Sequence, residues 1–346
     1  AEHLAEARHR IPGSVGLTFG LAVALQHGGD LAESVALYRE VLERDPSRVD
    51  AFLNLLVVLN GLGSVREAEE LGRKAIERFP EHPFLQFNVG QAYMSAGRLK
   101  EAVDCFKKSL SLKPDFIKAK IGLGNALSSL SDPVGAEAAY REALELEPGS
   151  AIASNNLGAL FLDSASFPDA ELFFHQAIRA NPDYGEAYSN LCSCQRELGK
   201  LEDALANGRR AVELFRSVGS LNNLGMVLHA MGNYAEALSV FEAALVLDER
   251  SGAVNSNLAR VLLELRQYEL SEKHARRAQS DESTEQGALY LLASISQAKG
   301  RYSEAEGYFS QLLSAEPDNL RALAARAGLY EMRGDFSAAQ EDYQSA

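Results

Sequence analysis

The sequence of 346 residues contains no tryptophan and few cysteines. Cys105, Cys192 and Cys194 make neither a disulfide framework nor a zinc-binding set. No apolar run reaches the roughly 18 residues that suggest a membrane-spanning helix, so we expect no membrane insertion. A signal-peptide pattern is also missing, and because the chain begins with Ala1 rather than Met, we expect that its N-terminus is truncated.

Basic residues are fewer than acidic ones: the sequence has 34 Lys and Arg and 48 Asp and Glu, which gives a net charge of −14. A nucleic-acid partner would require a basic stripe that neutralises phosphates, so we expect no nucleic-acid binding. The hydrophobic content of 46% is enough to form a core, which argues against general disorder. We therefore expect a soluble, cytoplasmic protein whose acidic surface favours basic partners.

The sequence does contain a regular internal repeat. Prolines recur every 34 residues, at Pro12, Pro46, Pro80, Pro114, Pro148 and Pro182. When the chain is aligned on this period, positions 8 and 20 hold mostly Gly, Ala or Ser, and position 24 is often Phe or Tyr. Two helices can pack closely where small side chains face each other, and a large residue at position 24 fills the remaining space. Each unit is thus predicted to be a pair of helices, with Gly ending the first and Pro following the second.

These columns resemble the tetratricopeptide repeat family over essentially the whole chain. The resemblance implies an all-α fold, a right-handed α-solenoid superhelix of about ten helix-turn-helix repeats whose first helices line a concave groove. We expect a single solenoid over residues 1–346. Its predicted parts are a partial repeat at 1–14, repeats near 15–48, 49–82, 83–116, 117–150, 151–184, 185–217, 218–251, 252–285 and 286–319, and a partial repeat at 320–346.

A column of asparagines occupies position 6 of six repeats: Asn54, Asn88, Asn156, Asn190, Asn223 and Asn257. In the family this position faces the groove, and an amide offers a donor and an acceptor to a peptide backbone. The arrangement is similar to the asparagine ladder in the repeat domain of O-linked N-acetylglucosamine transferases. Three other interpretations remain open: the column is inherited by duplication, it is merely solvated, or its amides bond to a neighbouring repeat.

Position 5 also faces the groove in the family. It is apolar in the early repeats, where it includes Phe87 and Ile121, and polar later, where it includes Asn155 and Asn222. Arg260 adds a charge at position 9 of the eighth repeat. The apolar residues are either an extension of the core or a hydrophobic binding pocket.

The sequence therefore predicts a protein–protein interaction module that binds an extended polypeptide. One alternative is the recognition arm of an enzyme, such as a glycosyltransferase, whose catalytic domain lies outside these residues. Another is a self-associating scaffold in bacterial envelope, secretion or organelle assembly, which would be a homo-oligomer. The seven histidines are scattered without metal-binding spacing, and no catalytic triad can be argued, so we expect no metal, cofactor or catalysis within these residues.

Overall fold

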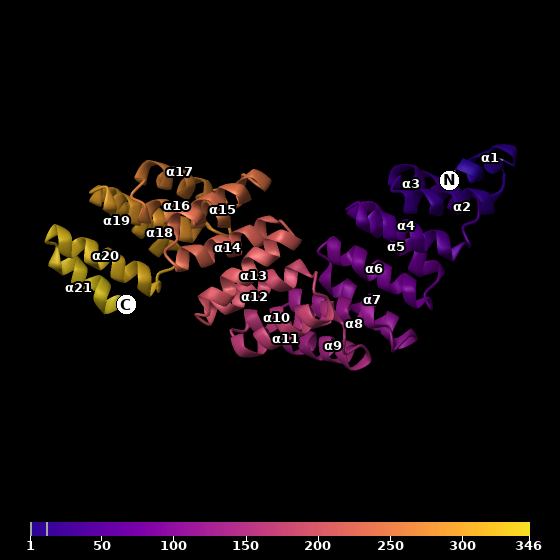
Figure 1. Cartoon of the computed structure of the whole chain (residues 1–346), viewed down its shortest axis with the longest axis horizontal. Coiled ribbons are helices and arrows are strands. Elements are labelled where there is room, and N and C mark those ends of the chain that lie inside the picture. The colour runs from indigo at the N-terminus through magenta and orange to yellow at the C-terminus, as the bar shows by residue number, and fades with distance from the viewer. Residues whose placement is uncertain (1, 12) are drawn as a thin grey trace. The chain divides into compact units, whose positions relative to one another are not determined.

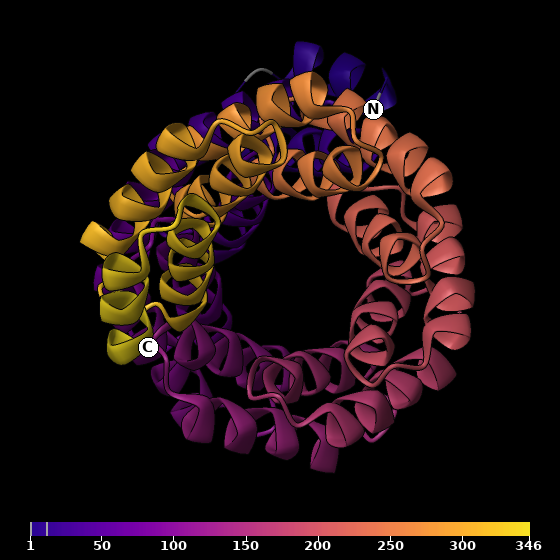
Figure 2. The same ribbon diagram turned by 90° about the vertical axis from the view of Figure 1, so that its left-hand side faces the viewer.

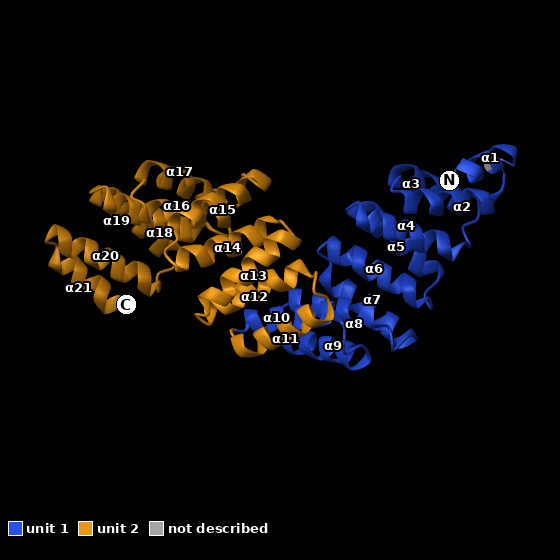
Figure 3. Ribbon diagram, in the orientation of Figure 1, with its two compact units in different colours: residues 1–164 blue, residues 165–346 orange. Residues whose placement is uncertain are grey.

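The computed structural model describes residues 2–11 and 13–346, and this part of the chain consists of 21 α-helices without a β-strand (Figure 1). The all-α prediction is confirmed. The chain divides into two compact units, residues 1–164 and 165–346 (Figure 3), which are described separately below. Ala1 and Pro12, which belong to the predicted partial repeat and to the proline spacing, lie outside the described residues.

Unit 1 contains ten helices in its described part: α1 Glu2–Arg10, α2 Val15–Gly28, α3 Leu31–Arg44, α4 Val49–Gly61, α5 Val65–Arg78, α6 Pro83–Ser95, α7 Leu99–Leu112, α8 Ile117–Ser129, α9 Pro133–Leu146 and α10 Ala151–Asp163. Unit 2 contains the other eleven: α11 Phe167–Ala180, α12 Gly185–Glu197, α13 Leu201–Leu214, α14 Val218–Ala230, α15 Tyr234–Leu247, α16 Gly252–Glu264, α17 Tyr268–Gln279, α18 Glu285–Ala298, α19 Tyr302–Ala315, α20 Leu320–Arg333 and α21 Phe336–Ser345. None of the described helices is long and apolar enough to cross a membrane. That both units form one solenoid stays a prediction.

The turn between the two helices of a repeat requires a left-handed backbone conformation. Gly232, two residues after the end of α14, has φ of 76° and shows why glycine is favoured there, since it lacks the Cβ that clashes in this region. Arg266 occupies the same place after α16 with φ of 58°. Because a residue with a side chain is strained in this conformation, the turn of the eighth repeat carries backbone strain that a glycine would avoid.

The small residues at position 8 allow the two helices of a repeat to approach closely. A Cβ built on Gly225 of α14 would lie 2.6 Å from a ring carbon of Phe241, which is fully buried on α15. Gly90 of α6 stands in the same relation to Phe106 of α7, at 2.7 Å. These contacts confirm the predicted pairing of a small residue at position 8 with a large one at position 24.

Within each unit the even-numbered helices, which are the first helices of the repeats, form one layer. In unit 1, α2, α4, α6, α8 and α10 each contact the next of the series, and in unit 2 the same holds for α12, α14, α16 and α18. The odd-numbered helices pack against these first helices rather than extensively against one another in the described part of the chain. The two layers can be followed in Figure 2. The exposed surface of the first-helix layer is called the first-helix face below.

Candidate functional site

Two of the predicted site residues, Asn155 and Asn156, are adjacent on α10 of unit 1. Asn156 is partly buried, and its Nδ2 donates to Oδ1 of Asn125 on α8 over 2.8 Å. The same oxygen accepts a hydrogen bond from the hydroxyl of Tyr140 at 2.7 Å. Asn155 is buried, and its Nδ2 lies 3.5 Å from Oδ1 of Asn156. Asn156 therefore links the fifth repeat to the fourth.

The other two asparagines of unit 1 are placed differently. Nδ2 of Asn88 donates to the carbonyl oxygen of Phe84 within α6 at 3.0 Å. The backbone carbonyl of Asn88, in turn, accepts from Nδ2 of Asn60 on α4 at 3.1 Å. Asn54 on α4 lies beside Tyr38, where burial raises the pKa of the phenol and a hydrogen bond with Asn54 opposes that rise. Among the described residues, the side-chain amide of Asn88 thus bonds within its own helix and not between repeats.

In unit 2 the amides again join neighbouring first helices. Nδ2 of Asn223 on α14 donates to the carbonyl oxygen and to Oγ of Ser189 on α12, at 3.2 and 3.1 Å. Nδ2 of Asn257 on α16 donates to Oδ1 of Asn222 on α14 at 2.9 Å. Nδ2 of Asn222 lies 3.6 Å from Sδ of Met226, one turn further along the same helix. Asn190 is partly buried on α12.

The interpretation in which the amides bond to a neighbouring repeat is therefore confirmed for Asn156, Asn223 and Asn257. Asparagine costs a helix interior about 0.5 kcal/mol relative to alanine. A hydrogen bond between side chains returns roughly 1 kcal/mol, so an amide that joins two repeats offsets that cost. The contact of these amides with a peptide remains a prediction.

The apolar residues of unit 1 belong largely to its core. The ring of Phe87 packs against Phe106 and Phe116, with centroids 5.9 and 5.0 Å apart, and is only partly exposed. Ile121 is partly buried on α8. Phe84 extends this aromatic group, since its ring lies 5.1 Å from Phe116 and the residue is 42% exposed. Phe87 is thus an extension of the core, whereas Phe84 presents an aromatic surface to solvent.

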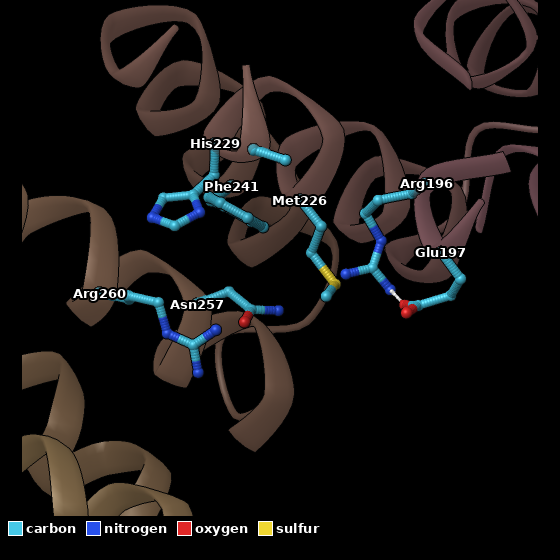
Figure 4. A pocket seen from close by; sticks show the side chains of 8 residues that line it. Arg196, Glu197, Met226, His229, Phe241, Asn257 and Arg260 are labelled. Carbon is cyan, nitrogen blue, oxygen red and sulfur yellow. Dashed lines mark hydrogen bonds and ion pairs between the residues drawn. The ribbon is translucent and has the colours of Figure 1, made fainter. Parts of the chain in front are cut away.

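Unit 2 contains a cavity of about 250 Å³ between three successive first helices (Figure 4). Its lining residues come from α12, α14, α15 and α16: Arg196, Glu197, Met226, His229, Ala230, Phe241, Asn257 and Arg260. Two of them, Asn257 and Arg260, are predicted site residues, and the structure brings them together here. Figure 4 shows the side chains of Arg260 and Arg196 on opposite sides of Asn257.

The charges around this cavity are unevenly paired. Arg196 forms an ion pair with Glu197. Arg260 forms none with any residue that the structure describes, and desolvation lowers the pKa of its guanidinium, with Arg321 and Arg196 adding repulsion. His229 carries a buried Nε2 without a hydrogen-bond partner. Burial lowers the pKa of this imidazole, and the charge of Arg260 lowers it further.

Sequence reasoning missed Arg196 and His229 because it did not treat position 12 as facing the groove. Both residues occupy position 12 of their repeats, three residues after position 9 and seven after position 5. Residues at this spacing share one face of a helix, which is the signal that would have found them.

The cysteines and the acidic residues are the remaining candidates for a reactive thiol or a metal site. Burial raises the pKa of Cys105 and Cys194 to about 11 and that of Cys192 to about 12, so the thiols stay protonated and belong to the core. Among the described residues, no group of three or more His, Cys, Asp or Glu side chains could hold a metal ion.

The sequence matches three family models described as tetratricopeptide repeat. One matches residues 1–49, 19–83, 121–183, 160–218 and 290–346, which together make up more than half of the chain. The second and third match residues 83–116 and 218–251. The chain belongs to the tetratricopeptide repeat family. No curated protein sequence matches it.

Solved structures share the fold of this tetratricopeptide repeat chain at low sequence identity. A chain of the APC/C hetero-tetramer Cut9-Hcn1 is 20% identical, with a TM-score of 0.64, and the match covers 77% of our chain and 52% of that chain. A tetratricopeptide repeat protein from Parabacteroides merdae is 16% identical, with a TM-score of 0.60 and coverage of 72% and 98%. A monomeric mutant of IFIT1 with Gppp-AAAA is 16% identical, with a TM-score of 0.58 and coverage of 96% and 90%. Our chain thus spans about half the length of the Cut9-Hcn1 chain, and these likenesses concern the fold alone.

Tetratricopeptide repeats act in general as protein–protein interaction modules and are typically non-catalytic. The family membership therefore supports the predicted class of function. It leaves the binding surface to be argued from this chain's own residues.

Proposed function

We propose that the first-helix faces of this protein bind an extended polypeptide segment of another protein, with the position-6 asparagines contacting its backbone. The proposal depends most on the hydrogen bonds that three of these amides already make to a neighbouring repeat. Asn156, Asn223 and Asn257 each use Nδ2 to bond to the preceding repeat, which fixes the orientation of the side chain. An amide has two N–H groups and two acceptor lone pairs, so each retains bonding capacity for a ligand.

Fixed amides suit backbone recognition for two physical reasons. Their orientation is already set before binding, so less side-chain entropy is lost when the complex forms. Neighbouring helices lie about 8–10 Å apart, and an extended strand rises about 3.3 Å per residue, so one amide would serve about every third residue of the ligand. The contacts would be independent of ligand sequence, because the backbone carries no side-chain information.

The apolar surface of unit 1 would supply selectivity. Phe84, which is 42% exposed, and Val57, which is 46% exposed, lie on first helices of unit 1. Burying an aromatic or branched side chain removes apolar area from water, which contributes about 25 cal/mol per Å². Ligands with apolar side chains at matching intervals would therefore bind unit 1 more tightly than polar ones.

Asn88→Ala is the sharpest test, because among the described residues the side-chain amide of Asn88 bonds only within α6 and does not join two repeats. Alanine is the better helix former by about 0.5 kcal/mol, so the melting temperature should stay equal or rise. Peptides selected from a random display library on the wild-type protein should lose about 1 kcal/mol of binding free energy, or roughly fivefold in affinity. Fluorescence anisotropy with labelled peptides measures this change.

Asn207→Ala provides a matched control, since Asn207 lies on the second helix α13 and bonds to Gln195 of the same repeat. It should leave peptide affinity unchanged. Hydrogen exchange should show that bound peptides protect α4, α6 and α8 and not α3, α5 and α7. Equal affinity of the Asn88→Ala variant and the wild type, or protection confined to the second helices, would show that the proposal is wrong.

A further inference from the structure

We infer that the cavity between α12, α14 and α16 binds an oxyanion group, a carboxylate or a phosphate, on an acidic side chain of the polypeptide ligand. This inference rests on the proposed function and adds to it the chemistry of one ligand side chain. It names a specific anchor point in unit 2, whereas the amides would contact only backbone.

The first argument is the unbalanced charge at the cavity. The chain as a whole carries a net charge of −14, so acidic partners for an arginine are abundant. Arg260 nevertheless has no ion-pair partner in the described part of the chain. Arg196 reaches the same cavity, and both Arg196 and Arg321 repel the charge of Arg260. An anion placed in the cavity between the guanidinium groups of Arg260 and Arg196 would relieve the repulsion between these two.

The second argument is the imidazole of His229. His229 lines the cavity, and its Nε2 is buried without a hydrogen-bond partner, which is costly for a polar atom away from water. The charged and titratable groups near this ring are Arg196 and Glu197 of α12, Arg260 and Glu264 of α16, and Tyr234 of α15. If the ring turns so that this nitrogen faces the cavity, a ligand oxygen there would accept a hydrogen bond from it and satisfy it.

The third argument is the fit of the cavity to one small charged group. A volume of about 250 Å³ admits a side-chain carboxylate or phosphate but not a folded element. Met226 and Phe241 form apolar parts of the wall, and such surroundings strengthen charge interactions relative to water. A nucleic acid would need several phosphate contacts along a basic track. One compact cationic cavity in an acidic chain favours a polypeptide carrying a single acidic side chain.

The test uses small anions, so that it does not depend on a peptide partner. Glutarate and O-phosphoserine are added separately to the protein, and the imidazole signal of His229 is followed by NMR, with sodium chloride at equal ionic strength as the blank. The signal is assigned with the His229→Gln variant. Saturable shifts are expected with at least one probe, and the probe that binds more tightly identifies carboxylate or phosphate as the preferred group.

Arg260→Gln should weaken the binding of that probe by about tenfold or more, because it removes a charge-assisted hydrogen bond to the oxyanion. Arg209→Gln is the matched control, since Arg209 lies on the second helix α13 and pairs with Glu236. It changes the net charge equally and should leave binding unchanged. A circular dichroism spectrum of each variant verifies that it is folded.

Two results would overturn the inference: no saturable shift of the His229 signal beyond the chloride blank, or equal weakening by Arg260→Gln and Arg209→Gln. Tighter competition by a 5′-phosphorylated oligoribonucleotide than by a phosphoserine peptide would overturn the polypeptide assignment. These failures are distinguishable from failure of the proposed function. If peptides selected on the wild type bind in a manner sensitive to Asn88→Ala but not to Arg260→Gln, only the oxyanion site is wrong.

Discussion

Gly225→Ala measures how tightly the two helices of a repeat are packed. The added Cβ would lie 2.6, 2.7 and 2.9 Å from three ring carbons of Phe241. All three distances are shorter than a real Cβ contact, so either the ring or the helix must move. Phe241 is completely buried, which leaves its ring no path into solvent. The substitution therefore tests the packing of α14 against α15.

The size of the effect follows from two opposing contributions. Overpacking a close-packed core costs about 1–3 kcal/mol, and the buried ring places Gly225→Ala at the upper end. Alanine returns about 1 kcal/mol of helix propensity, so the net loss of unfolding free energy should be about 1–2 kcal/mol. Gly307→Ala is the control, because Gly307 lies within α19 and its Cβ would meet no atom within 4 Å. That variant should gain up to about 1 kcal/mol.

Urea denaturation followed by far-ultraviolet circular dichroism gives the free energy differences, and hydrogen exchange shows whether the loss is centred on α14 and α15. Local loss is expected because each repeat contacts only its neighbours. Phe241→Leu introduced into the Gly225→Ala background should recover part of the loss, since it removes the clashing ring. A Gly225→Ala protein that is as stable as the wild type, or stabilised as much as the Gly307→Ala protein, would refute the packing argument.

Two further predictions concern stability. Burial lowers the pKa values of three histidines, His82, His229 and His274, from the ordinary 6.5. Their contribution to the unfolding free energy should therefore be complete above pH 6.5 and be lost as the pH drops through the lowered pKa values. Melting curves recorded across this pH range measure the loss. A melting temperature that rises on acidification would contradict this sign. Arg266→Gly should raise the unfolding free energy by about 1 kcal/mol, because glycine removes the strain of φ at 58°. Unchanged urea midpoints would contradict it.

The repeat register was predictable from sequence because it depends on columns that every repeat shares. A small residue at position 8 and a large one at position 24 must meet wherever two helices pack, as Gly225 and Phe241 do. The helix ends follow in the same way, since a glycine such as Gly232 supplies the left-handed turn. Repetition turns weak local preferences into a strong signal.

The hydrogen-bond partners of the position-6 asparagines were not predictable, because these partners differ from one repeat to the next. Asn156 bonds to Asn125, at position 9 of the preceding repeat, whereas Asn257 bonds to Asn222, at position 5. Asn88 bonds within its own helix. One column of identical residues therefore has several local environments, and the choice depends on which side chains the preceding repeat offers.

The cavity in unit 2 escaped prediction for a different reason. Its residues come from three successive first helices and from one second helix, α15, and Arg196 and His229 lie near the ends of α12 and α14. No column of the repeat marks them, because neither residue recurs in neighbouring repeats at that position. A site that distinguishes one repeat from the others is, by its nature, absent from the pattern that identifies the fold.

Some of the position-6 asparagines would have two roles, in the stacking of repeats and in the proposed binding of a ligand. First helices of neighbouring repeats contact each other within each unit, so an amide at this contact stabilises the stacking of repeats. The same layer presents the face on which we propose that a polypeptide lies. A ligand that bonds to such an amide would hold two neighbouring first helices together, and by mass action it would stabilise the stacked form over an opened one. Stability and binding are therefore coupled at Asn223 and Asn257, and they are separable at Asn88, where the amide bonds within one helix.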